Sequence, residues 1–274
     1  MELSRARIVL TGATGGLGAA LATALSASGA QLLLSGRDAA LLAQAKQRHG
    51  DACAVCAADL ATPAGIETLA RAAQAFGATV LVNNAGIGGF GLLAEQESAT
   101  VERILAINLA APIQLTRAML PTLLAHPSAA VVNVGSAFGW IPFAGFAAYS
   151  AAKTGLRGFS QALRRELADT SVRVMHIAPR AIDTPLNSPA VVALNKALGN
   201  ACDTPQSVAA RIVGMLERDT ADALVGFPER FFAWLNGCAP MLIDRGVRGK
   251  LAVIKRHAAG STISNPRRTP CSDA

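Results

Sequence analysis

Short apolar segments alternate with helix-like segments along most of this 274-residue chain. Most of the apolar segments are continuous, which is typical of strands that are buried on both faces of a parallel sheet. Seven segments are expected to be strands: 8–10, 31–35, 52–57, 79–82, 130–134, 172–177 and 223–225. Those expected to be helices are 17–28, 39–48, 63–76, 99–124, 149–168 and 205–218. The alternation predicts an α/β fold: a single-domain, Rossmann-type, doubly wound parallel sheet of about seven strands flanked by helices.

The composition places the chain among globular proteins. Hydrophobic residues make up 51% of the sequence and charged residues 16%, which is enough apolar material for a sizeable core and excludes global disorder. No apolar segment reaches the ~18 residues of a membrane span, so we expect no stable membrane insertion. The N-terminus leads directly into the first strand segment and does not resemble a signal peptide. A cytoplasmic location is therefore expected.

The net charge of +7 is unevenly distributed. Residues 244–274 contain seven basic and two acidic residues and so carry most of that charge. The remainder of the chain is nearly balanced, and we therefore do not expect nucleic-acid binding. The sequence predicts a main domain over residues 1–243 and a basic C-terminal extension over 244–274. The end of the extension, rich in Ser, Thr, Pro and Arg from residue 258, is expected to be disordered.

The five cysteines are odd in number and scattered, which argues against a disulfide framework. Cys53 and Cys56 form a C-x-x-C pair, but they lie in a strand segment, where residues three apart point to opposite faces. Core filling is therefore favoured over metal or redox chemistry. His176 lies inside another strand segment and is interpreted as structural rather than as a catalytic base. No metal site is expected.

A glycine-rich turn follows the first strand segment and leads directly into a helix. Its sequence, residues 11–18, is Thr-Gly-Ala-Thr-Gly-Gly-Leu-Gly. Glycines allow the backbone to approach a pyrophosphate, and the free N–H groups at a helix start attract its negative charge. A glycine turn between a strand and a helix predicts a dinucleotide site.

The end of the second strand segment bears on which dinucleotide binds. An NAD enzyme usually carries an acidic residue there, hydrogen-bonded to the ribose 2′-OH. That position is Gly36 in this chain, and Arg37 follows, which suits the 2′-phosphate of NADP. Asp38 lies where it could cap the next helix instead of binding ribose. We expect NADP(H), with NAD(H) as the alternative.

Tyr149, the only tyrosine of the chain, lies four residues before Lys153. Residues at this spacing share one face of a helix. A free phenol has a pKa of about 10, and a nearby cation favours the phenolate and lowers that pKa. The pair is a candidate acid–base group, the alternative being an exposed tyrosine beside a solvated lysine.

Together these motifs resemble the classical short-chain dehydrogenase/reductase (SDR) family over residues 5–228. The glycine motif T-G-x-x-x-G-x-G of the family is followed in order by its later markers. The matching residues are Thr11, Gly12, Gly16, Gly18, Asp59, Leu60, Asn83, Asn84, Ala85, Gly86, Asn108, Ser136, Tyr149 and Lys153. The 13-residue interval from Ser136 to Tyr149 is the family's usual one. Gly15 also allows the glycine spacing of extended SDRs, but too few residues follow Lys153 for their larger substrate domain.

The resemblance implies an oxidoreductase that transfers hydride between a nicotinamide and a carbonyl or secondary alcohol. The implied catalytic residues are Asn108, Ser136, Tyr149 and Lys153. The implied cofactor-binding residues are Gly12, Thr14, Gly16, Leu17, Gly18, Arg37, Asp59, Leu60, Asn84, Ala85, Gly86, Tyr149, Lys153, Pro179, Ile182 and Thr184. A non-catalytic cofactor-sensing or scaffold protein on the same fold is the alternative. It is disfavoured because all four catalytic positions are filled.

The resemblance also assigns roles and partners. Tyr149 would exchange the proton, Lys153 would lower its pKa and hold the nicotinamide ribose, and Ser136 would donate a hydrogen bond to the substrate oxygen. Asn108 would hold a water that relays protons from Lys153. Relatives form homodimers or homotetramers through the helices expected at 99–124 and 149–168. The family's Pro-Gly after the sixth strand is Pro179-Arg180 here, and Arg180 could reach an anion or be a tolerated surface change.

Two aromatic clusters bear on the substrate. Residues 138–146 together with Tyr149 contain five of the 12 aromatic residues, and in the family this loop borders the substrate pocket, so an apolar carbonyl or alcohol substrate is expected. The second cluster comprises Phe227, Phe231, Phe232 and Trp234, and the apolar stretch 240–243 follows. A lid or a subunit contact is favoured there over a membrane surface, because the sequence shows no clean basic amphipathic helix.

Overall fold

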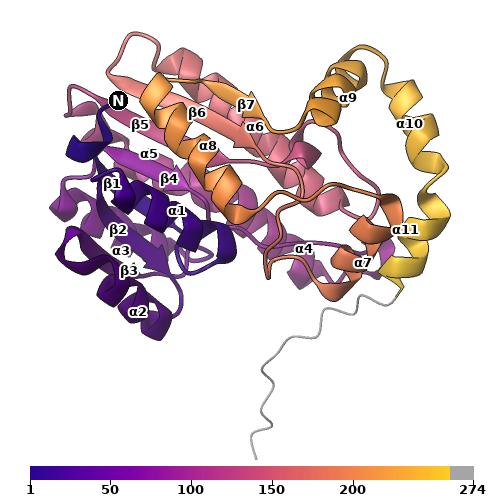
Figure 1. Cartoon of the computed structure of the whole chain (residues 1–274), viewed down its shortest axis with the longest axis horizontal. Helices are drawn as coiled ribbons and strands as arrows, with labels where there is room; N and C mark the ends of the chain where they lie inside the picture. The colour runs from indigo at the N-terminus through magenta and orange to yellow at the C-terminus, as the bar shows by residue number, and fades with distance from the viewer. Residues whose placement is uncertain (260–274) are drawn as a thin grey trace, which may run out of the picture.

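The computed structural model describes residues 1–259, which form one seven-stranded sheet with helices on both faces (Figure 1). The strands are β1 (Arg7–Thr11), β2 (Gln31–Gly36), β3 (Cys53–Ala57), β4 (Val80–Asn83), β5 (Ala129–Val134), β6 (Val172–Ala178) and β7 (Asp222–Leu224). All neighbours pair in parallel, in the order β3-β2-β1-β4-β5-β6-β7. This is the predicted doubly wound Rossmann-type sheet, and the fold prediction is confirmed.

The helices of the described residues alternate with the strands and continue beyond the last one. They are α1 (Gly16–Ala27), α2 (Ala39–His49), α3 (Pro63–Phe76), α4 (Ser98–Leu105), α5 (Ala111–Leu124), α6 (Ala147–Glu166), α7 (Pro189–Leu198), α8 (Pro205–Arg218), α9 (Phe227–Cys238), α10 (Pro240–Arg248) and α11 (Leu251–Ala258). Short 3₁₀ turns cover Leu3–Arg5, Gly50–Ala52, Leu93–Glu95 and Ala137–Gly139.

Each face of the sheet has its own hydrophobic core. Leu10 and Val82 pack with α1 and α8 on one face, whereas their strand neighbours Val9 and Leu81 pack with α3 and α5 on the other. All four side chains are fully buried. Because successive strand residues point to opposite faces, a strand covered on both sides must be apolar throughout. This explains why the sequence shows continuous apolar segments.

The edge strand β3 differs from the prediction that it is buried. Within this strand Cys53 is buried, Ala54 and Cys56 are partly buried, and Val55 and Ala57 are exposed, because the strand has one strand neighbour and lies at the end of the sheet. Cys53 packs in one core and Cys56 against the other, as expected for opposite faces. Both thiols are free, and burial raises the pKa of each.

The helix predicted over 99–124 is interrupted in its middle. A turn of π-helix, Ala106–Ala110, separates α4 from α5 and contains Asn108. The combined run Ser98–Leu124 is the one helix among residues 1–259 with the length and apolar composition of a membrane span, and 44% of its most apolar stretch is buried inside the fold. Ile104, Leu115 and Met119 lie almost completely buried, which is the pattern of a core helix.

Four helices were not predicted. α7 has ordinary boundary signals: Ser188 caps it by accepting from the Val191 N–H, Pro189 occupies its first turn, and Gly199 ends it in the left-handed conformation. α9, α10 and α11 follow the last strand and lie at the end of the molecule furthest from α2 (Figure 1). α10 continues through residue 243, where the sequence suggested the boundary of the extension. The tail predicted to be disordered falls mostly outside the described residues.

Candidate active site

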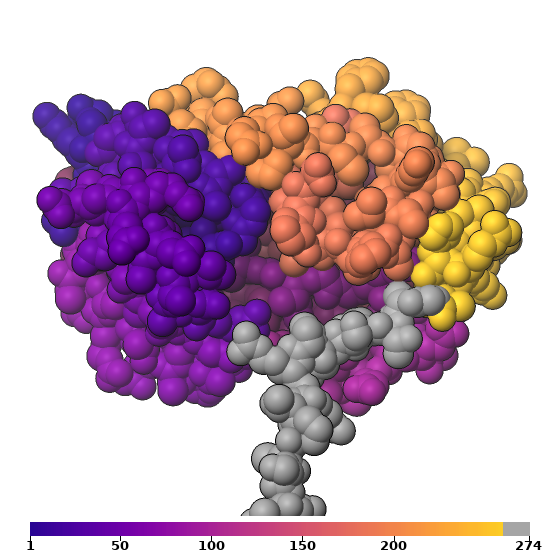
Figure 2. Space-filling model, turned by 60° about the horizontal axis from the view of Figure 1, so that its bottom comes forward, coloured from indigo at the N-terminus to yellow at the C-terminus, as the bar shows by residue number. Residues whose placement is uncertain are grey.

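A cavity of about 1300 Å³ opens at the carboxyl ends of the central strands. Strand order reverses between β1 and β4, and in open α/β sheets this is where ligands bind. Every one of the catalytic and cofactor-binding residues predicted from the sequence lines this cavity. Figure 2 shows the surface hollowed between the indigo N-terminal part and the orange segment that includes α7.

The glycine turn lies against the end of β4, and two of its glycines have no room for a side chain. Gly12 has a φ of 65°, and a Cβ there would lie 2.8 Å from the Cα of Ala85. A Cβ on Gly18 would collide with the carbonyl oxygen of Gly12. α1 begins at Gly16 with Gly15 as its N-cap, and no side chain caps it. The first N–H groups of α1 therefore remain available, and this donor set fits a pyrophosphate.

The turn after β4 is bonded to the end of β1. The Nδ2 of Asn84 donates to the carbonyl oxygen of Thr11 at 2.9 Å, and the Thr11 hydroxyl accepts from the N–H groups of Asn84 and Ala85, each at 3.0 Å. Asn83 continues the network through the sheet, donating to the side-chain oxygen of Asn133 at 2.8 Å. These bonds fix the two loops that form the floor of the cavity.

Arg37 and Asp38, the two residues after β2, have different environments. The Asp38 carboxylate accepts from the Ala40 and Leu41 N–H groups at 2.9 and 3.0 Å and so caps α2. Arg37 is exposed at the cavity rim, and no carboxylate pairs with it in the described part of the chain. A free guanidinium beside a capping carboxylate leaves this end of the cavity able to bind an anion.

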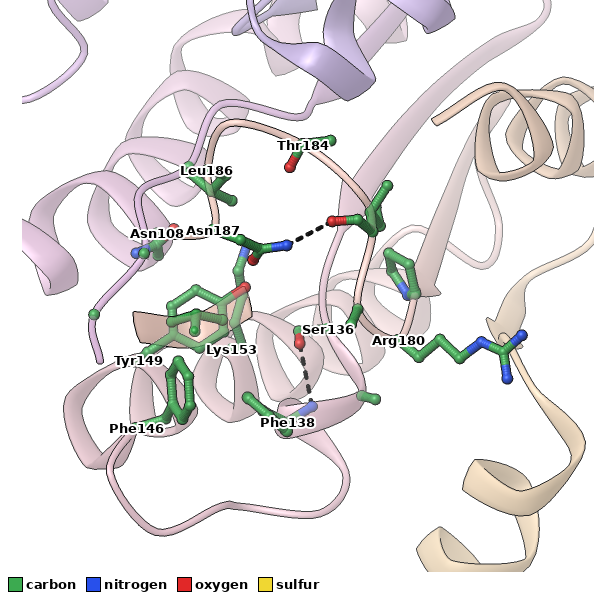
Figure 3. A pocket seen from close by; sticks show the side chains of 18 of the residues that line it. Asn108, Ser136, Phe138, Phe146, Tyr149, Lys153, Arg180, Thr184, Leu186 and Asn187 are labelled. Atoms are coloured by element: carbon green, nitrogen blue, oxygen red, sulfur yellow. Dashed lines mark hydrogen bonds between the residues drawn. The ribbon is translucent and has the colours of Figure 1, made fainter. Parts of the chain in front are cut away.

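The four candidate catalytic residues come from three segments. Tyr149 and Lys153 lie on α6, Ser136 follows β5, and Asn108 lies in the π-turn between α4 and α5. Figure 3 shows the hydroxyls of Tyr149 and Ser136 turned toward the same space. The Ser136 oxygen accepts from the Phe138 N–H at 3.2 Å, which fixes its rotamer and leaves its proton to donate.

Asn108 is fully buried and uses most of its hydrogen-bonding capacity. Its Nδ2 donates to the carbonyl oxygens of Ile87 and Ile104, both at 3.0 Å, and its Oδ1 accepts from the Ile87 N–H at 3.1 Å. The π-turn places this side chain against the loop after β4. Such turns occur frequently at functional sites, and one lone pair of Oδ1 remains for a further donor.

Lys153 is held in the interior rather than against the phenol. Its side chain is almost completely buried, its Nζ donates to the carbonyl oxygen of Val134 at 2.9 Å, and it lies 5.8 Å from the centre of the Tyr149 ring. Burial lowers the pKa of Lys153 from 10.5 to about 8. The cation that the sequence pairs with Tyr149 is thus itself easily deprotonated.

The pKa of Tyr149 is shifted in the direction opposite to the sequence expectation. Burial of the phenol raises this pKa above its usual value, and the nearby Ser136 hydroxyl offsets only part of the rise. The expected lowering by Lys153 is not seen in this structure: loss of hydration on burial dominates the pKa of Tyr149, and the Lys153 ammonium is bonded to the Val134 carbonyl oxygen instead.

Aromatic side chains form one wall of the cavity around Tyr149. The rings of Phe138 and Phe146 lie edge-on to Tyr149, with centroids at 6.4 and 6.2 Å, and Phe90 packs on Phe146 at 5.0 Å. These are favourable aromatic arrangements. The wall lies beside the Tyr149 ring.

Several lining residues could not be found from sequence motifs. The loop after β6 contributes Leu186 and Asn187, and the Asn187 Nδ2 donates to the carbonyl oxygen of Ile182 at 2.6 Å (Figure 3). The C-terminal helices contribute Phe232, Leu235, Leu242, Ile243 and Val247. The aromatic cluster in 227–234 and the apolar stretch 240–243 were the sequence signals for this side of the cavity.

His176 lies outside the cavity. His176 is fully buried in β6, its Nδ1 lies 3.2 Å from the Asp222 carboxylate, and it does not line the cavity. This agrees with a structural strand histidine. No cluster of potential metal ligands occurs among residues 1–259.

Arg180 points away from Tyr149 and Ser136, toward the start of α9 (Figure 3). Its guanidinium lies 2.8 Å from the Asp203 carboxylate and 3.8 Å from that of Glu229, in the first turn of α9. The hydrogen bond with Asp203 raises the pKa of Arg180 further, so it stays charged. Two carboxylates neutralise this arginine, which therefore links the loop after β6 to α9 rather than presenting a free cation to a substrate.

Replacing Arg180 with Ala is expected to lower the free energy of unfolding by about 1–3 kcal/mol, because two partly buried carboxylates lose their partner. Arg173→Ala is the matched control, since its pair with Asp219 is exposed, and it should cost less than about 1 kcal/mol. Urea denaturation measures both variants. Equal effects of the two substitutions would contradict the linking role of Arg180.

Comparisons with known proteins agree with this geometry. The model of the short chain dehydrogenase family matches residues 6–193. Dehydrogenase/reductase SDR family member 7B of Bos taurus is 32% identical over 257 residues, covering 87% of this chain and 79% of the relative. D-beta-hydroxybutyrate dehydrogenase of Cupriavidus necator is 36% identical over 183 residues, covering 65% and 71%. The crystal structure of 3-ketoacyl-(acyl-carrier-protein) reductase from Brucella melitensis, complexed with NADH, has a TM-score of 0.75 at 27% identity, covering 81% of this chain and 96% of that one.

The doubly wound sheet, the glycine turn and the nearby hydroxyls define an oxidoreductase that uses a nicotinamide cofactor. Similar solved structures hold NADH, NADP⁺ or NADPH. The chain belongs to the short-chain dehydrogenase/reductase family, in its classical branch. The resemblance predicted from the sequence motifs is thereby confirmed.

Proposed function

We propose that the chain is an NADP(H)-dependent oxidoreductase that interconverts an apolar ketone or aldehyde and its alcohol, with Tyr149 as general acid and base. The observation that carries the proposal is the meeting of the glycine turn, Ser136, Tyr149 and Lys153 in one cavity. A non-catalytic cofactor sensor is the alternative, and measured turnover distinguishes the two.

The bound nicotinamide would supply or accept the hydride, and the side chains would handle the proton. Ser136, its rotamer fixed by the Phe138 N–H, donates to the substrate oxygen. Tyr149 gives its proton to that oxygen during reduction, and its raised pKa suits a group that must be protonated beforehand. Lys153 binds the nicotinamide ribose and returns a proton to Tyr149.

The proton path to solvent would pass beside Gly86. A Cβ on Gly86 would lie 2.9 Å from the Asn108 Oδ1 and 3.8 Å from the Lys153 Nζ. The missing side chain therefore leaves space between these two polar atoms, and a water there could accept from Lys153 and donate to the free lone pair of Oδ1.

Two further features support the choice of cofactor and substrate. Asp38 is occupied as a helix cap, which leaves Arg37 to bind a 2′-phosphate. The rings of Phe138, Phe146 and Phe90 beside Tyr149 favour an apolar substrate.

We place the enzyme in the cytoplasm as a homodimer or homotetramer. Leu105 and Leu124, at the ends of α4 and α5, are exposed and available to a subunit contact.

A panel of carbonyl substrates, assayed with NADPH and NADH in parallel, tests the proposal. Apolar ketones and aldehydes are expected to be reduced with a higher kcat/KM than short polar oxo acids, and NADPH is expected to be preferred. Arg37→Ala should lower kcat/KM for NADPH by about 10–100-fold and leave NADH unchanged, since one charged hydrogen bond to phosphate is lost.

Arg48→Ala, at the other end of α2, is the control for the loss of a positive charge, and it should change neither cofactor's kinetics. A preference for NADH that Arg37→Ala leaves unaltered would refute the assignment of NADP(H). Binding of either cofactor without turnover of any panel member would favour the cofactor sensor.

A further inference from the structure

The helices α9 and α10 are apolar on two sides. Ala233 is the one buried residue of α9, and α10 has none. On the inner side, Phe232, Leu235 and Leu242 line the cavity. The helices thus cover the substrate side of the cavity without burying their remaining apolar surface.

Their outer side carries a continuous aromatic stripe. Phe227, Phe231 and Trp234 have the i, i+4, i+7 spacing that places them on one helical face, and their exposed fractions are 82%, 52% and 62%. Met241, at the start of α10, is 69% exposed. The ring of Phe231 lies 6.1 Å from that of Trp234. We call these four residues the outer aromatic surface.

Exposed basic side chains lie on the same helices as the outer aromatic surface and on the following α11. Residues 227–259 contain six basic and two acidic residues. The basic residues are Arg230, Arg245, Arg248, Lys250, Lys255 and Arg256, and all of them are exposed. One of the acids, Glu229, faces Arg180. The helices therefore present an apolar surface within a positively charged region.

We propose that the outer aromatic surface binds the surface of an anionic lipid membrane. Aromatic side chains favour the membrane–water interface, and basic residues nearby are attracted to anionic headgroups. A second copy of the chain fits less well, because a twofold contact would bring the same basic region of each copy against the other. The helices would lie on the lipid surface without crossing it.

This placement gives the cavity an opening at the lipid surface. The inner side chains of α9 and α10 line the cavity while the outer ones contact lipid, so an apolar molecule would pass between membrane and cavity with little exposure to water. The inference goes beyond the proposed reaction, and its test requires no turnover.

Flotation of the full chain with vesicles tests the inference. We expect binding to vesicles of phosphatidylcholine mixed with phosphatidylglycerol, and much weaker binding to phosphatidylcholine alone or at high salt. The double variant Arg245→Glu with Arg248→Glu should weaken binding by about 30-fold or more. The triple variant Phe231→Ala, Trp234→Ala and Met241→Ala should also lose binding.

Matched controls lie on α2, at the far end of the sheet. Leu41→Ala and Arg48→Glu change an exposed apolar and an exposed basic residue there, and neither should alter flotation. Thermal unfolding confirms that each variant is folded. The inference is overturned if anionic vesicles are not bound, or if the charge and aromatic variants bind as the parent does. It is equally overturned if the aromatic variant changes only the sedimentation mass, since a second copy would then be the occupant.

Discussion

Replacing Tyr149 with Phe is expected to lower kcat by about 10²–10⁴-fold, the usual contribution of a positioned proton donor. The substitution keeps the ring that packs against Phe138 and Phe146 and removes only the hydroxyl. Binding of NADPH, measured by fluorescence titration, should remain nearly unchanged. Steady-state kinetics with the best substrate of the panel provides the comparison.

The same variant serves as the blank for a titration of the phenol. Since the chain has a single tyrosine, the difference in ultraviolet absorbance between parent and variant reports on Tyr149 alone. Its pKa is expected to lie above the ordinary value because the folded chain partly buries the phenol and removes water from it. If Tyr149→Phe retains a tenth or more of the parental kcat, Tyr149 is not the proton donor. A tenfold loss corresponds to an increase of only about 1.4 kcal/mol in the activation free energy.

The buried Lys153 is expected to make the free energy of unfolding strongly dependent on pH. Its pKa is about 8 in the folded protein against 10.5 ordinarily, so between these values the unfolded chain binds more protons than the folded one. Stability therefore rises with pH across this window, whereas below pH 8 the full cost of a buried cation remains. Lys153→Met removes the titrating group and its pH dependence.

The free energy of unfolding of the parent, relative to Lys153→Met, is expected to rise by about 2–3 kcal/mol between pH 7 and pH 10. Urea denaturation of both proteins at the two pH values measures this, and other titrating groups cancel in the difference. Lys46→Met, on the exposed side of α2, is the control and should show no such change. If the difference in unfolding free energy between the parent and Lys153→Met is the same at pH 7 and pH 10, then Lys153 is hydrated in solution.

The sheet and the catalytic positions could be predicted from the sequence because their signals are local. A strand buried on both faces must be apolar, and the glycine turn must lack side chains where Gly12 and Gly18 meet neighbouring backbone. The boundaries of α3 and α8 also follow from single residues, since a Thr cap and a Pro in the first turn mark both starts.

The features that the sequence did not predict depend on distant partners. The π-turn at Asn108 is bonded to Ile87, which lies on another loop. The raised pKa of Tyr149 comes from burial that only the folded chain produces. α9 and α10 bury almost none of their residues, so the apolar periodicity that usually marks a helix face was difficult to interpret there.

The pairing of Arg180 with Asp203 and Glu229 has a consequence for how the sequences of homologues differ. The three charged residues come from the loop after β6, the segment before α8 and the first turn of α9. With the family's glycine at 180, the carboxylates of Asp203 and Glu229 would lose their shared cation. The three positions should therefore change together in descent: homologues with glycine at 180 are expected to lack at least one of the two acids, and this covariation would trace the history of the C-terminal helices.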